Sequence, residues 1–212
     1  MTRGRFISFE GGEGMGKSTQ ARLLSEALQN RGLTVELTRE PGGTPGAEAI
    51  RSLLLDPPGE GWGKEAEALL FAAARSDHVS RRIKPALAAG RWVVCDRFLD
   101  SSRAYQGVAG GLGDAKVREL HQIGSHGLLP DVTILIDACG AEVTERLAAR
   151  DGGISDAIGG RDAAYHEAVN RAFLQFARQE PERFCVIDGT GNIDAVHGRI
   201  MTAIAPMFDT AA

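Results

Sequence analysis

The sequence feature that most constrains this chain is the segment GGEGMGKS at residues 11–18. It follows the apolar run FISF and precedes TQARLL, a segment typical of the start of a helix. The pattern G-x-x-x-x-G-K-[ST] places a glycine-rich turn between a strand and a helix. Such a turn directs backbone N–H groups and the positive end of the helix at one point, where phosphate oxygens bind. The segment therefore predicts a phosphate-binding loop, or P-loop.

Each residue type in this loop has a chemical reason to be there. Gly11, Gly14 and Gly16 allow a phosphate to approach the backbone, because a side chain would occupy its space. Lys17 can reach the β- and γ-phosphates of a nucleotide, and the Ser18 hydroxyl is placed to ligate Mg²⁺. A glycine-rich turn that binds nothing is the alternative, but the strand before it and the helix after it disfavour that interpretation. The predicted ATP-binding residues are Gly11, Gly12, Glu13, Gly14, Met15, Gly16, Lys17, Ser18 and Thr19.

Length and charge exclude several classes of protein. The 212 residues suffice for one well-cored α/β domain spanning residues 1–212, with a small mobile segment. A formal net charge of -4 disfavours a nucleic acid polymer as partner, since such proteins need a basic face. No apolar run approaches the length of a membrane span, and the chain enters its first strand without a signal segment. We therefore expect a cytoplasmic protein that does not bind a membrane.

Cysteine and histidine spacing gives no sign of a metal centre. Cys95, Cys139 and Cys185 lie at or near the ends of apolar runs without C-x-x-C spacing, which predicts small buried side chains in a reducing compartment. The five histidines also lack ligand spacing. We expect them to be ordinary surface or partly buried side chains.

Strands alternate with helices along the whole chain. The predicted strands are residues 6–9, 35–38, 92–95, 132–136 and 184–187, and the predicted later helices are residues 64–89 with a break at Pro85, 114–125, 141–150, 163–178 and 194–207. Residues 107–113 form a predicted flexible loop. This alternation predicts a three-layer α/β/α P-loop kinase fold with a five-stranded parallel sheet.

Polar residues follow two of the predicted strands. Asp96 and Arg97 come directly after the apolar strand 92–95. An acid at that point in a P-loop protein is well placed to hold the water shell of Mg²⁺, although a solvated carboxylate at a strand end is the alternative. The turn REPGGT at residues 39–44 follows another strand, and open parallel sheets bind ligands at these ends.

Residues four apart on two helices predict a pocket for a base. Phe71 and Arg75 share a helix face, where an aromatic ring can stack on a base while the guanidinium bonds its edge. Periodicity alone also allows Phe71 to be a core residue. Ser101 with Tyr105, and Ser102 with Gln106, form two further pairs with this spacing.

Phosphoryl transfer fits the residues available. It needs positioning and charge neutralisation more than covalent help, which agrees with the lack of a candidate catalytic histidine. An acceptor phosphate is itself anionic, so several arginines are expected outside the P-loop, and the candidates are Arg39, Arg51, Arg75, Arg97, Arg150 and Arg161. The polar, glycine-rich residues 151–162 predict a mobile lid, with a connector that has no catalytic part as the alternative.

Four motifs together resemble the thymidylate kinases of bacterial type. They are FEGGEGMGKST at residues 9–19, TREPGGT at 38–44 with Arg51 downstream, EALLFAAARSDH at 67–78 and VCDRFLDSSRAYQG at 94–107. The similarity continues through LLPDVTILID at residues 128–137 to the last helix. The resemblance implies transfer of the ATP γ-phosphate to thymidine 5′-monophosphate (dTMP) with Mg²⁺, supply of dTTP for DNA synthesis, and a homodimer.

The resemblance also implies roles by motif position. Glu13 would lie near the deoxyribose and phosphates, Glu40 and Arg51 near the acceptor sugar and phosphate, Arg97 on the acceptor phosphate, Phe71 stacked on thymine, Arg75 at its O4, and Ser101, Ser102 and Gln106 around the base edge. Tyr105 would lie where a ribose 2′-hydroxyl would clash. Cytosine carries an amine in place of O4, so Arg75 would face donor with donor, at a cost of about 1–3 kcal/mol.

One position departs from the family. Similar bacterial enzymes carry a lid arginine in a D-R-x-E-like segment, but here the corresponding residues are Asp156, Ala157, Ile158 and Gly159. Alanine cannot stabilise transferring charge. We therefore expect Arg150 or Arg161 to supply it, which gives Glu13, Lys17, Arg97, Arg150 and Arg161 as the catalytic set.

Two other functions remain open at this point. A kinase for another monophosphate or for a deoxynucleoside would share the P-loop and Asp96-Arg97, but the Phe71 and Arg75 pair and residues 101–106 speak against it. A nucleotide-dependent switch or binding module, with a lid that has lost its arginine, would bind ATP with negligible turnover.

Overall fold

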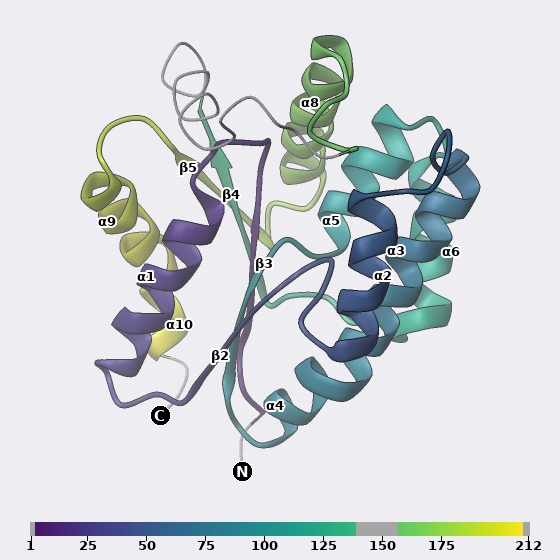
Figure 1. Cartoon of the computed structure of the whole chain (residues 1–212). Helices are drawn as coiled ribbons and strands as arrows, with labels where there is room; N and C mark the ends of the chain where they lie inside the picture. The colour runs from purple at the N-terminus through teal and green to yellow at the C-terminus, as the bar shows by residue number, and fades with distance from the viewer. Residues whose placement is uncertain (1–2, 139–156, 210–212) are drawn as a thin grey trace.

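A five-stranded parallel sheet lies at the centre of the protein, with strand order β2-β3-β1-β4-β5 (Figure 1). The computed structural model describes residues 3–138 and 157–209. The strands are β1 (Phe6–Glu10), β2 (Val35–Arg39), β3 (Trp92–Asp96), β4 (Val132–Asp137) and β5 (Phe184–Asp188). The predicted α/β fold with five parallel strands is confirmed, and each strand extends one residue beyond its predicted carboxyl end.

Helices cover both faces of the sheet (Figure 1). They are α1 (Lys17–Gln29), α2 (Pro45–Leu55), α3 (Lys64–His78), α4 (Lys84–Ala88), α5 (Leu99–Ser102), α6 (Asp114–Ser125), α8 (Ala163–Gln179), α9 (Ile193–Ile204) and α10 (Pro206–Asp209), with π-helical segments η1 (Val79–Ile83) and η2 (Arg103–Ala109). In Figure 1, α1, α9 and α10 lie on one side and the other helices on the opposite side. None of the described helices is long and apolar enough to span a membrane.

Alternate residues of the central strands supply the hydrophobic cores on the two faces of the sheet. In β1, Ile7 and Phe9 pack with α1 and α9, whereas Phe6 belongs to the core on the other face. In β3, Val94 and Val93 divide in the same way. Because a strand with helices on both sides has no solvent face, its sequence is apolar throughout instead of alternating. This explains why apolar runs identified the central strands.

The long helix predicted for residues 64–89 changes geometry before its proline. It is regular from Lys64 to His78, π-helical over Val79–Ile83, and regular again to Ala88. Pro85 has no N–H to continue the hydrogen-bond ladder, and the wider turns that precede it take up this defect. The interruption is therefore confirmed, but it begins upstream of Pro85.

The flexible loop predicted for residues 107–113 was wrong in its first part. Gly107 to Ala109 belong to η2, and Gly110 N donates to Tyr105 O at 2.7 Å. Gly107 packs closely on Asp114 and Val117, where a Cβ would lie 3.4 Å from each. Packing against α6 thus orders a glycine-rich segment that composition alone assigns to a loop.

The cysteine prediction is partly correct, and other predictions fall outside the described residues. Cys95 is buried but Cys185 is only half-buried, because it lies on the edge strand β5. Cys139, Arg150, the helix at residues 141–150 and the lid up to residue 156 lie outside the described residues. Residues 157–160 form a turn, and Asp162 caps α8 by accepting from Tyr165 N.

Candidate functional site

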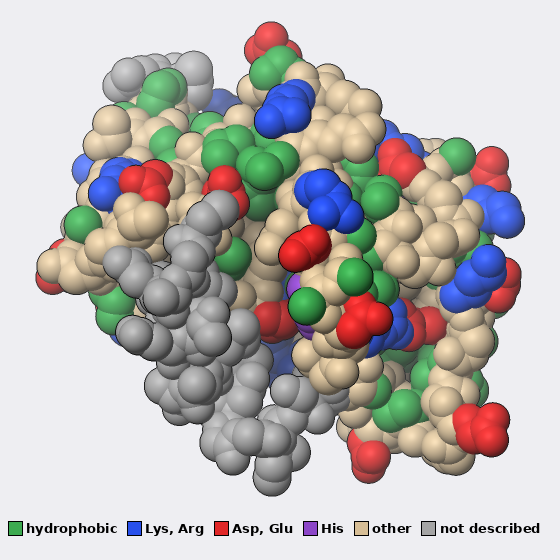
Figure 2. All heavy atoms as spheres, turned by 90° about the horizontal axis from the view of Figure 1, so that it is seen from above, with side chains coloured by type: hydrophobic (Ala, Val, Ile, Leu, Met, Phe, Trp, Pro, Cys, Tyr) green, Lys and Arg blue, Asp and Glu red, His purple; other side chains and the backbone are tan. Residues whose placement is uncertain are grey.

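A cavity of about 990 Å³ opens at the carboxyl edge of the sheet. Seen from above in Figure 2, acidic and basic side chains surround a hollow near the middle of this face. The predicted site residues that line it are Glu13, Gly14, Met15, Gly16, Lys17, Ser18, Thr19, Glu40, Arg51, Phe71, Arg75, Asp96, Arg97, Ser101, Ser102, Tyr105 and Gln106. Gly11, Gly12 and Arg161 lie off the cavity wall. The ends of β1, β2 and β3 thus bring distant motifs to one place.

The P-loop glycines are needed for two different reasons. At Gly16 the backbone is left-handed, with φ 78°, and an added Cβ would meet nothing within 4 Å. That open space suits a ligand. At Gly11, with φ 138°, a Cβ would lie 2.5 Å from the Ile136 carbonyl oxygen on β4. The prediction that a side chain at Gly11 would occupy the phosphate's space was therefore wrong. A side chain at Gly11 would collide with the backbone of β4 instead.

Lys17 is held over the loop from the first turn of α1. Lys17 is only 6% exposed, and its Nζ donates to the Gly12 carbonyl oxygen at 2.5 Å. Burial, together with the positive charge of Arg97, lowers the pKa of Lys17 to about 8. An anion beside Nζ would oppose both effects, so the pocket favours a negatively charged ligand.

Ser18 and Asp96 meet below the loop. Ser18 Oγ donates to Asp96 Oδ2 at 2.5 Å, and the buried Asp96 Oδ1 has no hydrogen-bond partner among the described residues. A buried carboxylate oxygen without a partner is costly unless a ligand satisfies it. A hydroxyl and a carboxylate are oxygen donors of the kind that Mg²⁺ prefers. The described residues hold no cluster of three or more acidic, histidine or cysteine ligands, so such a cation would take its other ligands from water and phosphate.

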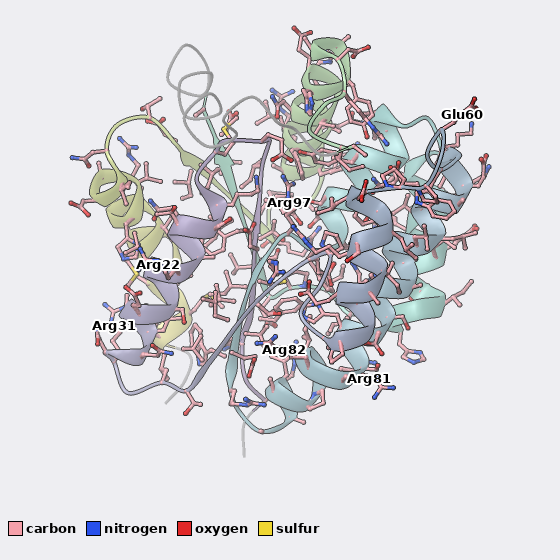
Figure 3. The ribbon with its side chains drawn as sticks, in the orientation of Figure 1. Arg22, Arg31, Glu60, Arg81, Arg82 and Arg97 are labelled. Atoms are coloured by element: carbon pink, nitrogen blue, oxygen red, sulfur yellow. The ribbon has the colours of Figure 1, made fainter. Side chains whose placement is uncertain are left out.

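Arg97 connects the P-loop to α5 through its side-chain hydrogen bonds. Nη2 donates to Glu13 Oε1 at 2.5 Å, and Nη1 donates to Ser101 Oγ at 3.1 Å. Its backbone is left-handed, with φ 67°, which is uncommon for a residue other than glycine. Figure 3 shows Arg97 in the middle of the molecule, between α1 on one side and α2 and α3 on the other. Arg97 thus lines the cavity while it is bonded both to Glu13 of the P-loop and to Ser101 of α5.

Tyr105, on η2, contacts both Glu13 and Arg97. Its hydroxyl donates to Glu13 Oε1 at 3.2 Å, and the Arg97 guanidinium lies 5.1 Å from its ring centroid. Burial raises the pKa of the Tyr105 phenol, so the group stays protonated and able to donate.

Glu10 supports Arg97 indirectly, because it bonds Ser101, which in turn bonds Arg97. Sequence reasoning missed this residue. It is fully buried, and it accepts from Phe98 N at 2.8 Å and from Ser101 Oγ at 2.6 Å. Burial and the nearby Asp100 raise the pKa of Glu10 to about 7. The only sequence signal was an acid directly after an apolar strand, the same signal that identified Asp96.

Arg75 is fixed by a buried group of polar residues. Nε donates to Glu40 Oε2 at 2.7 Å, and Nη2 donates to Ser102 Oγ at 2.9 Å. His78 lies between Glu40 Oε1, at 3.0 Å, and Thr38 Oγ1, at 2.7 Å. Burial alone would raise the pKa of Glu40, but Arg75 and His78 hold it below its usual value. Nη1 of Arg75 has no hydrogen-bond partner among the described residues, so it can donate to a ligand.

The prediction for His78 was therefore wrong. It was expected to be an ordinary surface or partly buried histidine, but it is fully buried and bonded at both ring nitrogens. Its distance of 38 residues from Glu40 hides this contact in the sequence.

Phe71 and Arg51 border the same end of the cavity. Phe71 is half-buried: it lines the cavity and packs against the core that contains Tyr105 and Phe173. Its ring thus has a face for a ligand, which an ordinary core residue lacks. Arg51 Nη1 donates to the Pro41 carbonyl oxygen at 2.8 Å, which holds the turn after β2 against α2.

Buried ion pairs anchor the helical segment that carries Tyr105 and Gln106. Arg103 is 1% exposed and pairs with Asp100, at 2.8 Å, and with Asp114, at 2.7 Å. Its guanidinium lies 3.9 Å from the Phe176 ring centroid. Sequence reasoning gave Arg103 no role, because its partners lie on α5, α6 and α8.

The cavity also extends past the P-loop to residues that sequence reasoning missed. Gly191, Asn192, Ile193 and Asp194 line this end, just after β5, and Gln20 Nε2 donates to Ile193 O at 2.9 Å. The available signal was the turn TGN shortly after the apolar strand 184–187, because the carboxyl ends of parallel strands lie at one edge.

Comparison with known proteins gives a consistent result. The family model described as thymidylate kinase matches residues 9–200. The chain is 55% identical to the thymidylate kinase of Rhizorhabdus wittichii, over 97% of this chain and 99% of that one. It is 47% identical to that of Nitrobacter winogradskyi, over 95% and 88% of the two chains. The crystal structure of thymidylate kinase from Ehrlichia chaffeensis superposes with a TM-score of 0.78 at 31% identity, covering 95% and 99%.

Proposed function

Since this chain belongs to the thymidylate kinase family and phosphorylates dTMP to dTDP with ATP, we propose that the cavity binds the two nucleotides end to end. The observation that carries the proposal is that the P-loop and the Phe71–Arg75 pocket line one cavity, in which Arg97 bonds both Glu13 of the loop and Ser101 of α5. The transferred phosphoryl group would pass beside the Arg97 guanidinium. Two polyanions repel each other, so a fixed cation at their meeting point addresses the main obstacle to transfer.

ATP occupies the loop end of the cavity in this proposal. Its phosphates lie over Gly14 to Thr19, where Lys17 neutralises charge on the transferred group. Its base points toward residues 191–194, which form the wall next to α1.

The acceptor occupies the other end. Thymine stacks on Phe71, and Arg75 Nη1 donates to O4, while Glu40, Arg51 and Tyr105 border the sugar. An acceptor phosphate oxygen attacks the γ-phosphorus as the bond to the β–γ bridging oxygen breaks, and ADP leaves. A phosphate dianion needs no general base, so positioning by Arg97 and Glu13 carries the chemistry of this end.

Mg²⁺ fits the donor set at Ser18 and Asp96. The two side chains offer a hydroxyl and a carboxylate, and Asp96 Oδ1 is buried without a partner among residues 3–138 and 157–209. Bound there, the cation would neutralise charge on the donor phosphates. Ser18 and Asp96 would orient its water shell.

We propose that Arg150 or Arg161 supplies the positive charge of the lid that stabilises the transferred phosphoryl group. Ala157 supplies none, and Arg150 lies outside the described residues. Arg161 pairs with Glu67 and donates to the Tyr165 hydroxyl at 2.5 Å. Arg161 would have to leave both partners to reach the phosphates, so an Arg161→Ala variant with full turnover would leave Arg150 as the source.

We also propose a homodimer. The family resemblance supports it, as do two exposed apolar side chains on adjacent helices, Leu69 on α3 and Ile123 on α6, which are 56% and 77% exposed. Light scattering tests the assembly, and a single-chain mass at micromolar concentration would contradict it.

A bisubstrate compound tests whether one cavity holds both nucleotides. Adenosine and thymidine joined 5′ to 5′ through five phosphates should compete with ATP and with dTMP in steady-state kinetics. It should bind more tightly than either, because linking the two halves makes the second binding step intramolecular. EDTA should weaken its binding if Mg²⁺ bridges the phosphates. Competition with only one nucleotide would contradict the shared cavity.

A further inference from the structure

Glu67 begins a stripe of three residues on α3 that leads into the proposed base pocket. It precedes Phe71 by four residues and Arg75 by eight, so all three share one helix face. Phe71 and Arg75 line the cavity, whereas Glu67 is 7% exposed and lies behind the wall. A buried carboxylate in this position needs partners, and its partners connect it to the site.

One oxygen of Glu67 fixes the side-chain amide of Gln106. Gln106 Nε2 donates to Glu67 Oε1 at 2.9 Å, and Gln106 itself lines the cavity. A carboxylate paired with a guanidinium only accepts hydrogen bonds, so the amide must turn its nitrogen toward Glu67. The Gln106 carbonyl oxygen Oε1 has no partner among the described residues. It is therefore the atom that the side chain presents to a ligand.

The second oxygen of Glu67 is held by Arg161, two residues before the start of α8. Glu67 Oε2 pairs with Arg161, which also donates to the Tyr165 hydroxyl. That hydroxyl donates to the Tyr105 carbonyl oxygen at 2.8 Å, one residue before Gln106. These contacts close a ring through α3, α8 and η2. Glu67 cannot turn without breaking it, so the orientation of Gln106 is fixed before a ligand binds.

We propose that Glu67 is a positioning residue for base specificity, which orients Gln106 so that its carbonyl oxygen accepts the N3–H of thymine. This inference rests on the proposed function, in which the base lies on Phe71 with O4 toward Arg75. Thymine then meets a donor at O4 and an acceptor at N3–H. Cytosine has the reverse pattern, an amine at position 4 and a bare N3, so both contacts fail together.

The test is the ratio of kcat/KM for dTMP to kcat/KM for dCMP in a Glu67→Gln variant. A glutamine at position 67 can donate as well as accept, so the Gln106 amide is free to turn over. We expect the ratio to fall about tenfold, which is one lost hydrogen-bond preference. The loss should come from a higher KM for dTMP with kcat nearly unchanged, because the base is remote from the transferred group. Glu65→Gln is the matched control, since that side chain is 64% exposed on the same helix.

A double-mutant cycle separates the loss of Gln106 orientation from general damage to the fold. Leucine at position 106 leaves no amide to orient, so Glu67→Gln added to Gln106→Leu should not lower the ratio further. If Glu67→Gln fails to fold, Glu67→Asp takes its place in the cycle, because its shorter carboxylate also releases Gln106. An unchanged ratio in a folded Glu67 variant would overturn the inference. A parent protein that does not prefer dTMP to dCMP would instead overturn the proposed base pocket.

Discussion

Replacing Arg97 by alanine is expected to lower kcat for dTMP phosphorylation by ~10³-fold or more, the range found when an arginine that stabilises phosphoryl transfer is removed. Arg97 is a cation on the cavity wall, and it contacts Glu13 and Ser101. Its loss leaves the acceptor phosphate and Glu13 as unneutralised negative charges. Both effects raise the energy of the transition state, and the KM for dTMP should rise as well.

The matched control for Arg97 is Arg22→Ala. Arg22 lies on the outer side of α1 (Figure 3), pairs with Glu26 and has a side chain that is 55% exposed. Its removal should leave turnover within about twofold, because exposed ion pairs contribute little. Arg97→Lys should recover only part of the activity, since an ammonium cannot replace two directed guanidinium bonds. Turnover of folded Arg97→Ala within tenfold of the parent would contradict the assigned role.

Replacing Lys17 by alanine is expected to lower kcat by ~10²–10³-fold, the cost of losing one fixed donor to developing charge. Lys17 is buried at the loop, and its Nζ has only the Gly12 carbonyl oxygen as a described hydrogen-bond partner. That single contact lets the ammonium move to a phosphate when ATP binds. The dissociation constant for dTMP, measured by calorimetry without ATP, should stay within about threefold of the parent value, because Lys17 lies at the donor end.

Lys116→Ala serves as the control for Lys17. Lys116 is exposed on α6, outside the cavity, so its removal tests the general effect of losing one positive charge. A Lys17 variant that loses dTMP affinity as strongly as it loses turnover would place the lysine at the acceptor end and contradict this arrangement.

The fold was predictable because its signals are local. The three central strands β1, β3 and β4 are largely apolar runs buried on both faces, and all five strands end at a charged residue on the same edge of the sheet. The P-loop, the turn after β2 and Asp96-Arg97 therefore had to meet. The sequence interpretation failed at Gly107 to Ala109, where packing against α6 outweighed local composition. It also placed the helix interruption at Pro85, although the π-helical turns that accommodate the proline begin at Val79.

The lining of the cavity was predictable in large part, but its support was not. Phe71 and Arg75, like Ser102 and Gln106, are four residues apart on one helical face, and that spacing is visible in the sequence. Glu10 and His78 act through partners 38 to 91 residues away. No periodicity links such residues, so only the folded structure shows that Glu10 holds Ser101 and that His78 holds Glu40. The role of each lining residue remains a prediction for mutagenesis.

The thymine preference of the acceptor end is tested most directly by steady-state ADP release from Mg·ATP with four acceptors, namely dTMP and the deoxyuridine, deoxycytidine and deoxyguanosine monophosphates. A pocket that offers a donor from Arg75 and an acceptor from Gln106 predicts a kcat/KM for dTMP at least ~10²-fold above that for dCMP, since sites built on hydrogen bonds reject mismatched groups strongly. A kcat/KM for dCMP similar to that for dTMP would show that these two side chains do not read the base.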